Sequence, residues 1–196
     1  ASWKEILINV SQYFTQNRDQ VEQQAEQLMQ HLQQASIAPG ASVAAAAQDR
    51  DKMEADQQIF ETIMKTADRE EGGFGQAPKF PSTFVIRFLL DYYALYQDET
   101  ALRQACLSLD KMGLGGIYDQ IGGGFARYST DRYWIAPHFE KMLYDNALLI
   151  EVFSMAWVHT RDDLYRLIVE QTIAWLQREM MSEDFAFYAA QDADSE

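Results

Sequence analysis

The chain has 196 residues, which is long enough for one domain with a hydrophobic core and too short for two large domains. Asp and Glu number 30 against 16 Lys and Arg, so the formal net charge is −14. A surface of this sign repels the phosphates of nucleic acids and anionic membranes, and we therefore expect neither nucleic acid nor membrane among the partners.

Cysteine content and hydropathy exclude several further classes. The single cysteine, Cys106, permits no intrachain disulfide, no cysteine-rich zinc site and no Cys-x-x-Cys redox pair. No apolar run approaches the roughly 20 residues of a membrane-spanning helix, and polar residues interrupt the first apolar stretch where a signal peptide needs a continuous one. We expect a cytoplasmic protein that holds no metal and no cofactor.

Helical periodicity dominates the whole sequence. Helices are predicted over residues 2–16, 18–34, 49–70, 82–97, 99–113, 137–160 and 162–181. Residues 35–48 are small and uncharged, which is typical of a linker, and Gly113 is placed to end its helix as a left-handed residue. The predicted organisation is a helical joint over 1–34, a linker over 35–48 and a larger helical domain over 49–196.

The helices of the larger domain alternate in character. Helices 82–97 and 137–160 are apolar nearly all round, whereas helices 49–70, 99–113 and 162–181 are apolar on one stripe only. One-striped helices suit an outer layer, and helices apolar on most sides suit an inner layer. The pattern predicts an all-α fold, a stack of αα-hairpins that is either closed into a toroid or left as a solenoid.

Three long loops rich in glycine or small residues follow the predicted outer helices, over 72–81, 115–131 and 185–196. Because each leads from an outer helix toward an inner position, all three are expected at one end of the assembly. Long loops on one end of a helical scaffold usually build the functional site. The third loop has no inner helix after it, so we expect the chain to be a fragment of a larger protein.

The stretch Trp134–Leu149, WIAPHFEKMLYDNALL, places several ionisable groups at the start of an apolar helix. On a helix that begins at Pro137, with about 100° per residue, His138, Lys141 and Asp145 fall on one arc. They continue a face that is apolar further along. We expect this face to line a cavity that is open to water at the N-terminal end of the helix.

Glu140 and Tyr144 complete this cluster. A histidine beside carboxylates suits proton abstraction, and a pair of carboxylates suits acid–base hydrolysis of a glycoside, so the sequence leaves both chemistries open. A structural interpretation also fits. In that interpretation His138 hydrogen-bonds locally, and Lys141 forms an i,i+4 ion pair with Asp145.

The loops carry further candidates. The triplet Gly122–Gly124 predicts a structural turn, because neither of the glycine spacings that bind phosphate occurs there. Arg127 is placed either to bind an anion or to pair with Asp119, and Lys79 is placed either to contact a ligand or to pack within its loop. The run Asp192–Glu196 has only the start of a calcium-loop pattern, so we interpret it as polar loop residues near the pocket.

Three segments resemble a known family. GGFGQAPKFP (72–81), GGIYDQIGGGFARYSTDRYWIAPHFEKMLYDNA (115–147) and YAAQDADSE (188–196) are closely similar to the spermatogenesis-associated protein 20 family of thioredoxin-domain-containing proteins. The resemblance covers about 50–196 well and 1–34 more loosely. One departure is local, since Phe185–Tyr188 stands where the family usually has a Gly-Gly-Phe-Tyr turn.

The resemblance implies an (α/α)6 toroid, similar to N-acylglucosamine 2-epimerases and six-hairpin glycosidases, of which this chain would form about the first half. The partners it implies are a thioredoxin-like domain preceding residues 1–34, the remaining toroid helices and a sugar-like small molecule. We further expect the open edges of half a toroid to promote self-association.

Two functions remain open at this point. The first is an enzyme-like toroid that isomerises or hydrolyses a carbohydrate-like molecule, and the second is a non-catalytic helical binding module attached to a thioredoxin-like redox domain. For the first, the catalytic candidates are His138, Glu140, Asp145 and Asp192. The substrate-binding candidates are Lys79, Tyr118, Asp119, Arg127, Tyr128, Trp134, Lys141, Tyr144 and Asp194.

Overall fold

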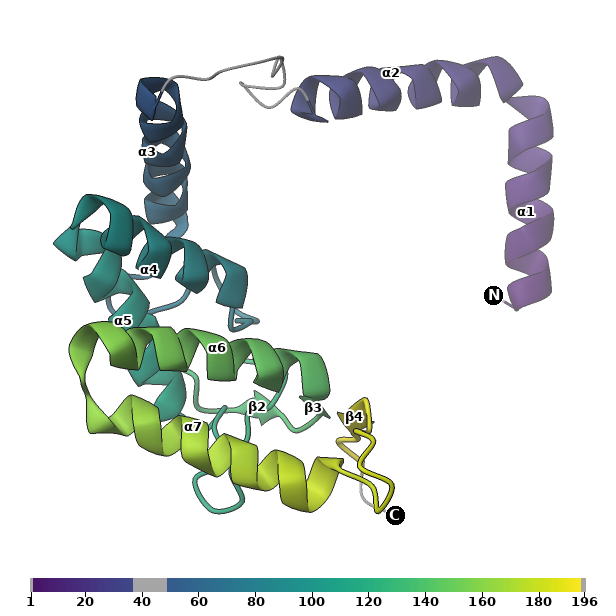
Figure 1. Ribbon diagram of the computed structural model, residues 1–196. Helices are drawn as coiled ribbons and strands as arrows, with labels where there is room; N and C mark the ends of the chain where they lie inside the picture. Colours follow the sequence, from purple (N-terminus) through teal and green to yellow (C-terminus); the bar gives the residue numbers. More distant parts are fainter. Residues whose placement is uncertain (1, 37–48, 195–196) are drawn as a thin grey trace. The chain divides into compact units, whose positions relative to one another are not determined.

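The computed structural model of the chain describes residues 2–36 and 49–194 (Figure 1). The chain divides into two compact units, Ala1–Ala55 and Asp56–Glu196, and each is described by itself. Most of the expected linker, residues 37–48, lies outside the described residues.

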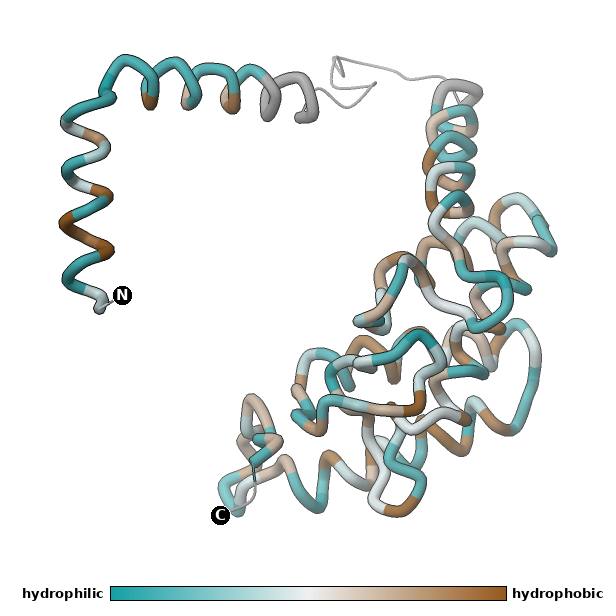
Figure 2. The backbone as a smooth tube through the Cα atoms, turned by 180° about the vertical axis from the view of Figure 1, so that it is seen from behind, coloured by the Kyte–Doolittle hydropathy of each residue, from teal (hydrophilic) through white to brown (hydrophobic). Residues whose placement is uncertain are grey.

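The first unit contains α1 (Trp3–Gln16) and α2 (Arg18–Ser36). A reciprocal cap starts α1, because the Ser2 hydroxyl accepts from the Glu5 amide at 3.3 Å and the Glu5 carboxylate accepts from the Ser2 amide at 2.8 Å. Hydrophobic positions recur along α1 between hydrophilic ones (Figure 2), and α1 buries none of them.

The second unit is built from two helical hairpins and the C-terminal part of the helix that precedes them. Its helices are α3 (Asp49–Thr66, which crosses the unit boundary), α4 (Thr83–Tyr96), α5 (Glu99–Gly113), α6 (Leu143–Thr160) and α7 (Asp163–Trp175), and α7 continues into a π-helical turn η1 (Leu176–Met180). The inner helices α4 and α6 contact each other, while α5 packs on α4 and α7 packs on α6 (Figure 1). The predicted alternation of inner and outer helices is confirmed.

The core of the second unit lies between these layers. Leu89 and Leu90 of α4, Leu109 of α5 and Phe153 of α6 are completely buried. Each such side chain contributes roughly 1.5–3 kcal/mol by leaving water, so this layered core holds the hairpins together. No helix of the described residues is both long and apolar enough to cross a membrane.

Both hairpins use the same tight connection. Gln97 and Arg161 end the inner helices in the left-handed conformation, with φ of 56° and 59°. The next residue in each case is an aspartate that caps the outer helix: Asp98 accepts from the Thr100 amide at 2.7 Å and Asp162 from the amide two residues on at 2.9 Å. These repeated dipeptides make the two short turns between inner and outer helices.

The start of α6 differs from the prediction. The helix begins at Leu143, not at Pro137, and residues 137–142 are non-helical, with short strands at 137–138 and 141–142. Strand β1 (Tyr128–Ser129) pairs with β2 (Pro137–His138), and β3 (Lys141–Met142) pairs with β4 (Ala190–Gln191), both antiparallel. The predicted helix was wrong here because the backbone amides and carbonyls of this segment bond to distant loops instead of to their own helix.

Gly113 also differs from the prediction. It is the last residue of α5 and is not left-handed. A Cβ at Gly113 would lie 2.5 Å from Cδ1 of Ile168 on α7. Glycine is therefore required for the close approach of two helices, and this cause is visible only in the tertiary structure.

The three long loops meet at one end of the second unit, as predicted. Lys79 of the first loop and Ser129 of the second exchange both backbone hydrogen bonds at 2.8 Å. The pairing of β3 with β4 then joins the segment between the second loop and α6 to the third loop. In Figure 1, β2, β3 and β4 lie beside the N-terminal end of α6.

Candidate functional site

Asp145 lies in the first turn of α6, where the loops meet. Its carboxyl is half-buried, and Oδ2 is enclosed without a hydrogen-bond partner among the described residues. Burial raises the pKa of the Asp145 carboxyl to about 6, with the charge of Arg127 opposing and that of Glu140 adding to the rise. The group therefore changes its charge close to neutral pH.

The next residue fixes the loop against the helix. The Asn146 side chain is completely buried, accepts from the Phe125 amide at 2.7 Å and donates to the Phe125 carbonyl at 3.0 Å. A second donation, to the Met142 carbonyl at 2.9 Å, satisfies the other amide hydrogen. These bonds set the position of the loop residues that follow Phe125 relative to Asp145.

Arg127 and Glu140 form the ion pair beside this carboxyl. Nη1 of Arg127 lies 3.0 Å from Oε2 of Glu140, and the Arg127 amide donates to the Glu140 carbonyl at 2.8 Å. Glu140 and then Tyr144 raise the pKa of the Arg127 guanidinium. Four predicted site residues, Arg127, Glu140, Tyr144 and Asp145, thus lie within electrostatic reach of one another.

His138 lies on the same loop as Glu140 but makes a different contact, with Tyr128. Its ring stacks on Tyr128, with centroids 4.9 Å apart and planes at 10°, and Phe80 packs on Tyr128 at 4.9 Å. Nδ1 of His138 is buried without a hydrogen-bond partner in the described part of the chain. Tyr128 is thus covered by two rings, and Tyr144, which is half exposed, is the more open aromatic surface.

The structural interpretation of the helix start proposed an ion pair between Lys141 and Asp145. Lys141 instead pairs with Asp119. Its ammonium lies 2.9 Å from Oδ2 of Asp119 and donates to the Gly123 carbonyl at 2.9 Å. The amides of Gly122 and Ile121 also donate to Asp119; although burial raises the pKa of this carboxyl, these bonds and Lys141 hold it below its ordinary value. Pairing with Asp119 was one of the two roles that the sequence left open for Arg127; in the structure Arg127 pairs with Glu140, and Lys141 pairs with Asp119.

A pocket of about 350 Å³ lies beside the Asp119–Lys141 pair. Its walls include Tyr118, Asp119, Pro137, Phe139 and Lys141, whereas His138 and Glu140 are not among its lining residues. The predicted helical face of His138, Lys141 and Asp145 is therefore wrong. The non-helical backbone of residues 137–142 divides these side chains between two neighbourhoods.

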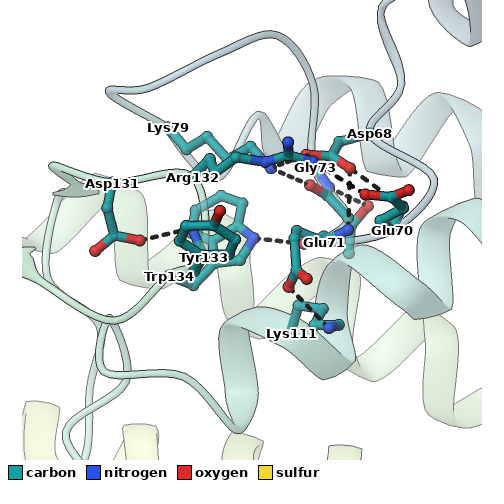
Figure 3. Close-up of polar contacts among 12 residues, drawn as sticks. Asp68, Glu70, Glu71, Gly73, Lys79, Lys111, Asp131, Arg132, Tyr133 and Trp134 are labelled. Carbon is teal, nitrogen blue, oxygen red and sulfur yellow. Dashed lines mark hydrogen bonds and ion pairs between the residues drawn. The ribbon is translucent and has the colours of Figure 1, made fainter.

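Lys79 is completely buried, and the sequence reasoning missed its partner. Its ammonium lies 2.7 Å from Oδ2 of Asp68, and Arg132 approaches the same oxygen at 3.0 Å (Figure 3). Burial raises the pKa of the Asp68 carboxyl, but the Glu71 amide, Lys79 and the Glu70 amide together bring it well below its ordinary value. Only its place just ahead of the glycine loop marks Asp68 in the sequence.

Trp134 is part of the same buried cluster. Its indole Nε1 donates to the Glu71 carbonyl at 2.8 Å, and its side chain is completely buried, next to the Lys79 ammonium at 5.5 Å (Figure 3). Neither Lys79 nor Trp134 presents surface to a ligand in this chain. Their contacts fix the first loop against the second.

The remaining candidates are Tyr118, Asp192 and Asp194. The Tyr118 hydroxyl donates to Gln171 at 2.7 Å, while Asp192 and Asp194 are exposed near the end of the third loop. Among residues 2–36 and 49–194, no group of three or more His, Cys, Asp or Glu side chains is arranged to hold a metal ion.

Comparison with known proteins shows the family of this sequence through its relatives, although no family model matches it. Spermatogenesis-associated protein 20 of Homo sapiens is 41% identical over 140 residues, which cover 69% of this chain and 18% of the human protein. The chain belongs to the spermatogenesis-associated protein 20 family. The Mus musculus member matches at the same identity and coverage, and an uncharacterized protein of Caenorhabditis elegans is 35% identical over 149 residues, 71% of this chain and 20% of that protein. The chain therefore spans about a fifth of the length of these relatives.

Solved structures show the fold of this family member. A sugar epimerase from a ruminal bacterium superposes with a TM-score of 0.63 at 16% identity, covering 72% of this chain and 40% of that one. Cellobiose 2-epimerase of Bacillus thermoamylovorans gives 0.62 at 15%, covering 71% and 40%, and a D-mannose isomerase gives 0.57 at 18%, covering 74% and 40%. The likeness establishes an epimerase-type α/α toroid architecture, of which this chain has a part.

Proposed function

We propose that this chain supplies part of a toroid that binds a carbohydrate-like small molecule and transforms it by acid–base chemistry of the isomerase or hydrolase type. Its support is the fold shared with sugar epimerases and a D-mannose isomerase, together with the ionisable cluster at the N-terminus of α6. Identities of 15–18% support the fold alone, so the proposed chemistry rests on the ionisable cluster.

The raised pKa and the unpartnered oxygen of the Asp145 carboxyl are the observations that carry the proposal. A carboxyl whose pKa is about 6 holds a proton for part of the time near neutral pH, and its enclosed oxygen has no partner among the described residues. Groups with these two properties are suited to deliver or accept a proton from a bound molecule. A structural carboxylate, such as Asp68, instead has its oxygens occupied and its pKa lowered.

The neighbours of Asp145 suit the same role. Arg127, held by Glu140, offers a cation to an oxygen on which negative charge develops. His138, on the loop that carries Glu140, is the second acid–base group of the proposal. Epimerisation needs two such groups, one to remove the proton beside the carbonyl and one to return a proton to the opposite face. The exposed ring of Tyr144 offers a surface for a sugar ring.

The second candidate is a non-catalytic binding module attached to a thioredoxin-like redox domain. The observation that favours it is that Lys79, Arg127 and Lys141 are all engaged in ion pairs within the loops. In this alternative the charged residues stabilise the loop architecture, and the toroid presents a surface to a partner.

The deciding experiment uses the longer parent protein, because this chain covers only about 40% of the similar toroids. Cellobiose and D-mannose are incubated with it in deuterium oxide, and proton NMR follows exchange at C2 and the appearance of an epimer, a ketose or a hydrolysis product. We expect turnover that Asp145→Asn and His138→Ala each reduce by at least about 100-fold, the usual contribution of a general acid or base.

A matched control is Asp184→Asn, an exposed loop carboxylate outside the cluster, which should leave turnover unchanged. Melting temperatures of all variants separate chemistry from folding. Loss of stability in the two cluster variants, with no turnover of any sugar by the wild-type protein, would favour the binding module.

A further inference from the structure

A second pocket, of about 520 Å³, lies away from the cluster around Asp145, between the end of α3 and the outer side of α5. Its lining includes Met64, Arg69, Arg103, Gln104, Leu107 and Asp110. All of its lining residues belong to the second unit and are among the described residues.

Its two arginines are unusual in this chain. Neither Arg69 nor Arg103 lies within 4.0 Å of a carboxylate of the described residues, although acidic side chains outnumber basic ones 30 to 16. Every other arginine whose side chain is described pairs with a carboxylate, except Arg161, which lies over the Trp157 ring at 4.6 Å. The two guanidinium groups without a carboxylate or an aromatic partner thus line the same pocket.

Two carboxylates at this part of the chain, Asp68 beside Arg69 in sequence and Asp110 in the pocket lining, bond to other groups. Asp68, next to Arg69 in sequence, is held by Lys79 at 2.7 Å and Arg132 at 3.0 Å. Asp110 accepts the Tyr165 hydroxyl at 2.7 Å, and burial raises the pKa of its carboxyl, with a smaller rise from Asp162. Two arginines that line one pocket without a carboxylate of the described residues within ion-pair distance give this part of an acidic chain a local positive charge.

The polar and apolar walls define the kind of ligand. Arg103 is held along α5 by its hydrogen bond to Thr100 at 3.2 Å, and Gln104 is fixed by donating to the Asp68 carbonyl at 3.1 Å. Met64 and Leu107 give the pocket an apolar wall. Two guanidinium forks match the charge and the several acceptor oxygens of a phosphate dianion better than those of a single carboxylate.

We propose that this pocket binds the phosphate group of a small phosphorylated metabolite, with Arg69 and Arg103 on the phosphate and the organic part against Met64 and Leu107. The site is separate from the cluster around Asp145, and the proposal does not depend on the proposed function. Cys106 also lines the pocket, and the proposal assigns it no role.

The test is isothermal titration calorimetry on the full chain at fixed ionic strength, with glycerol 3-phosphate and inorganic phosphate as probes and sodium chloride as the blank. We expect saturable binding of glycerol 3-phosphate, tighter than that of inorganic phosphate. Arg69→Gln and Arg103→Gln should each weaken it about tenfold or more, because a charge-assisted hydrogen bond is lost. The control Arg166→Gln removes an exposed arginine of α7 that pairs with Asp163 and Glu170, and it should bind as the wild type does.

Both pocket substitutions replace exposed side chains, and far-UV circular dichroism with a melting curve verifies that each variant folds. Absence of saturable binding to the wild type overturns the proposal, as does equal weakening by Arg166→Gln. Succinate serves as a third probe: binding of this dicarboxylate as tight as that of glycerol 3-phosphate would overturn the assignment to phosphate.

Discussion

The Lys79 ammonium lies 2.7 Å from a carboxylate oxygen of Asp68, and the lysine side chain has no exposed surface. A buried lysine keeps its charge only where a carboxylate and further acceptors replace water, and here the Gly72 carbonyl supplies the additional acceptor at 2.7 Å. The pair joins the end of α3 to the first loop, and through the bridge to Ser129 it also fixes the second loop.

Removing this lysine should therefore be costly. We predict that Lys79→Met lowers the free energy of unfolding by about 3–5 kcal/mol, because Asp68 is left buried with one cation fewer. Lys111→Met is the matched control: Lys111 pairs with Glu71 at the same kind of distance, 2.8 Å, but is 38% exposed, so the expected loss is about 0–1 kcal/mol. Urea unfolding measures both, and equal losses would contradict the prediction.

The same pair makes stability depend on pH. The pKa of Asp68 is lowered in the folded protein, so its contribution is present above the ordinary carboxyl pKa and is lost as pH falls below it. We predict that wild-type stability falls as pH decreases from about 5 to 3 and that Asp68→Asn flattens this part of the profile. Unfolding curves at several pH values test it; an unchanged slope in the variant would count against it.

Asp145 should act in the opposite direction. Its pKa of about 6 is above the unfolded value, so the folded state binds more protons and loses stability as pH rises from about 4 to 6. Asp145→Asn removes the charge, and we predict a gain of about 1–3 kcal/mol over the wild type at pH 7.5 that disappears near pH 4. Asp192→Asn, which replaces an exposed carboxylate, should show no such pH-dependent gain.

Two glycines with similar backbones offer a test of packing. Gly75 and Gly124 have φ of 76° and 80°, but a Cβ at Gly75 would meet no atom within 4 Å, whereas one at Gly124 would lie 2.6 Å from the Trp175 ring. We predict that Gly75→Ala costs about 1–2 kcal/mol from the left-handed backbone alone. Gly124→Ala should cost about 1–3 kcal/mol more, because Trp175 must move. Thermal melts of the two variants compare the costs directly.

Self-association remains a prediction that concentration-dependent light scattering can test. Phe84 and Leu95 of α4 are each 71% exposed, and Val158 of α6 is more than half exposed. If these side chains promote association of the chain, Phe84→Asp should reduce its apparent mass at high concentration. A wild-type monomer at all concentrations would contradict the expectation.

The sequence determined the elements whose causes are local. The apolar patterns identified inner and outer helices. The caps at Asp98 and Asp162, found in the structure, also have a local cause, because each aspartate bonds to an amide two residues further on. Because each long loop follows an outer helix, the sequence also predicted that the three loops share one end, which the pairing of Lys79 with Ser129 and of β3 with β4 confirms. The family resemblance came from the same loop motifs and is confirmed by the relatives.

Only the tertiary structure decided how the site residues are grouped. Residues 137–142 carry a helical pattern, yet their backbone bonds to β1 and β4, which lie about 10 and 50 positions away in sequence. This pairing directs His138 to Tyr128, Glu140 to Arg127 and Lys141 to Asp119. The burial of Lys79 on Asp68 and the isolation of the Asp145 carboxyl likewise depend on distant segments. Periodicity records which face of an element avoids water, whereas the partner of each charge is set by which segments the fold brings together.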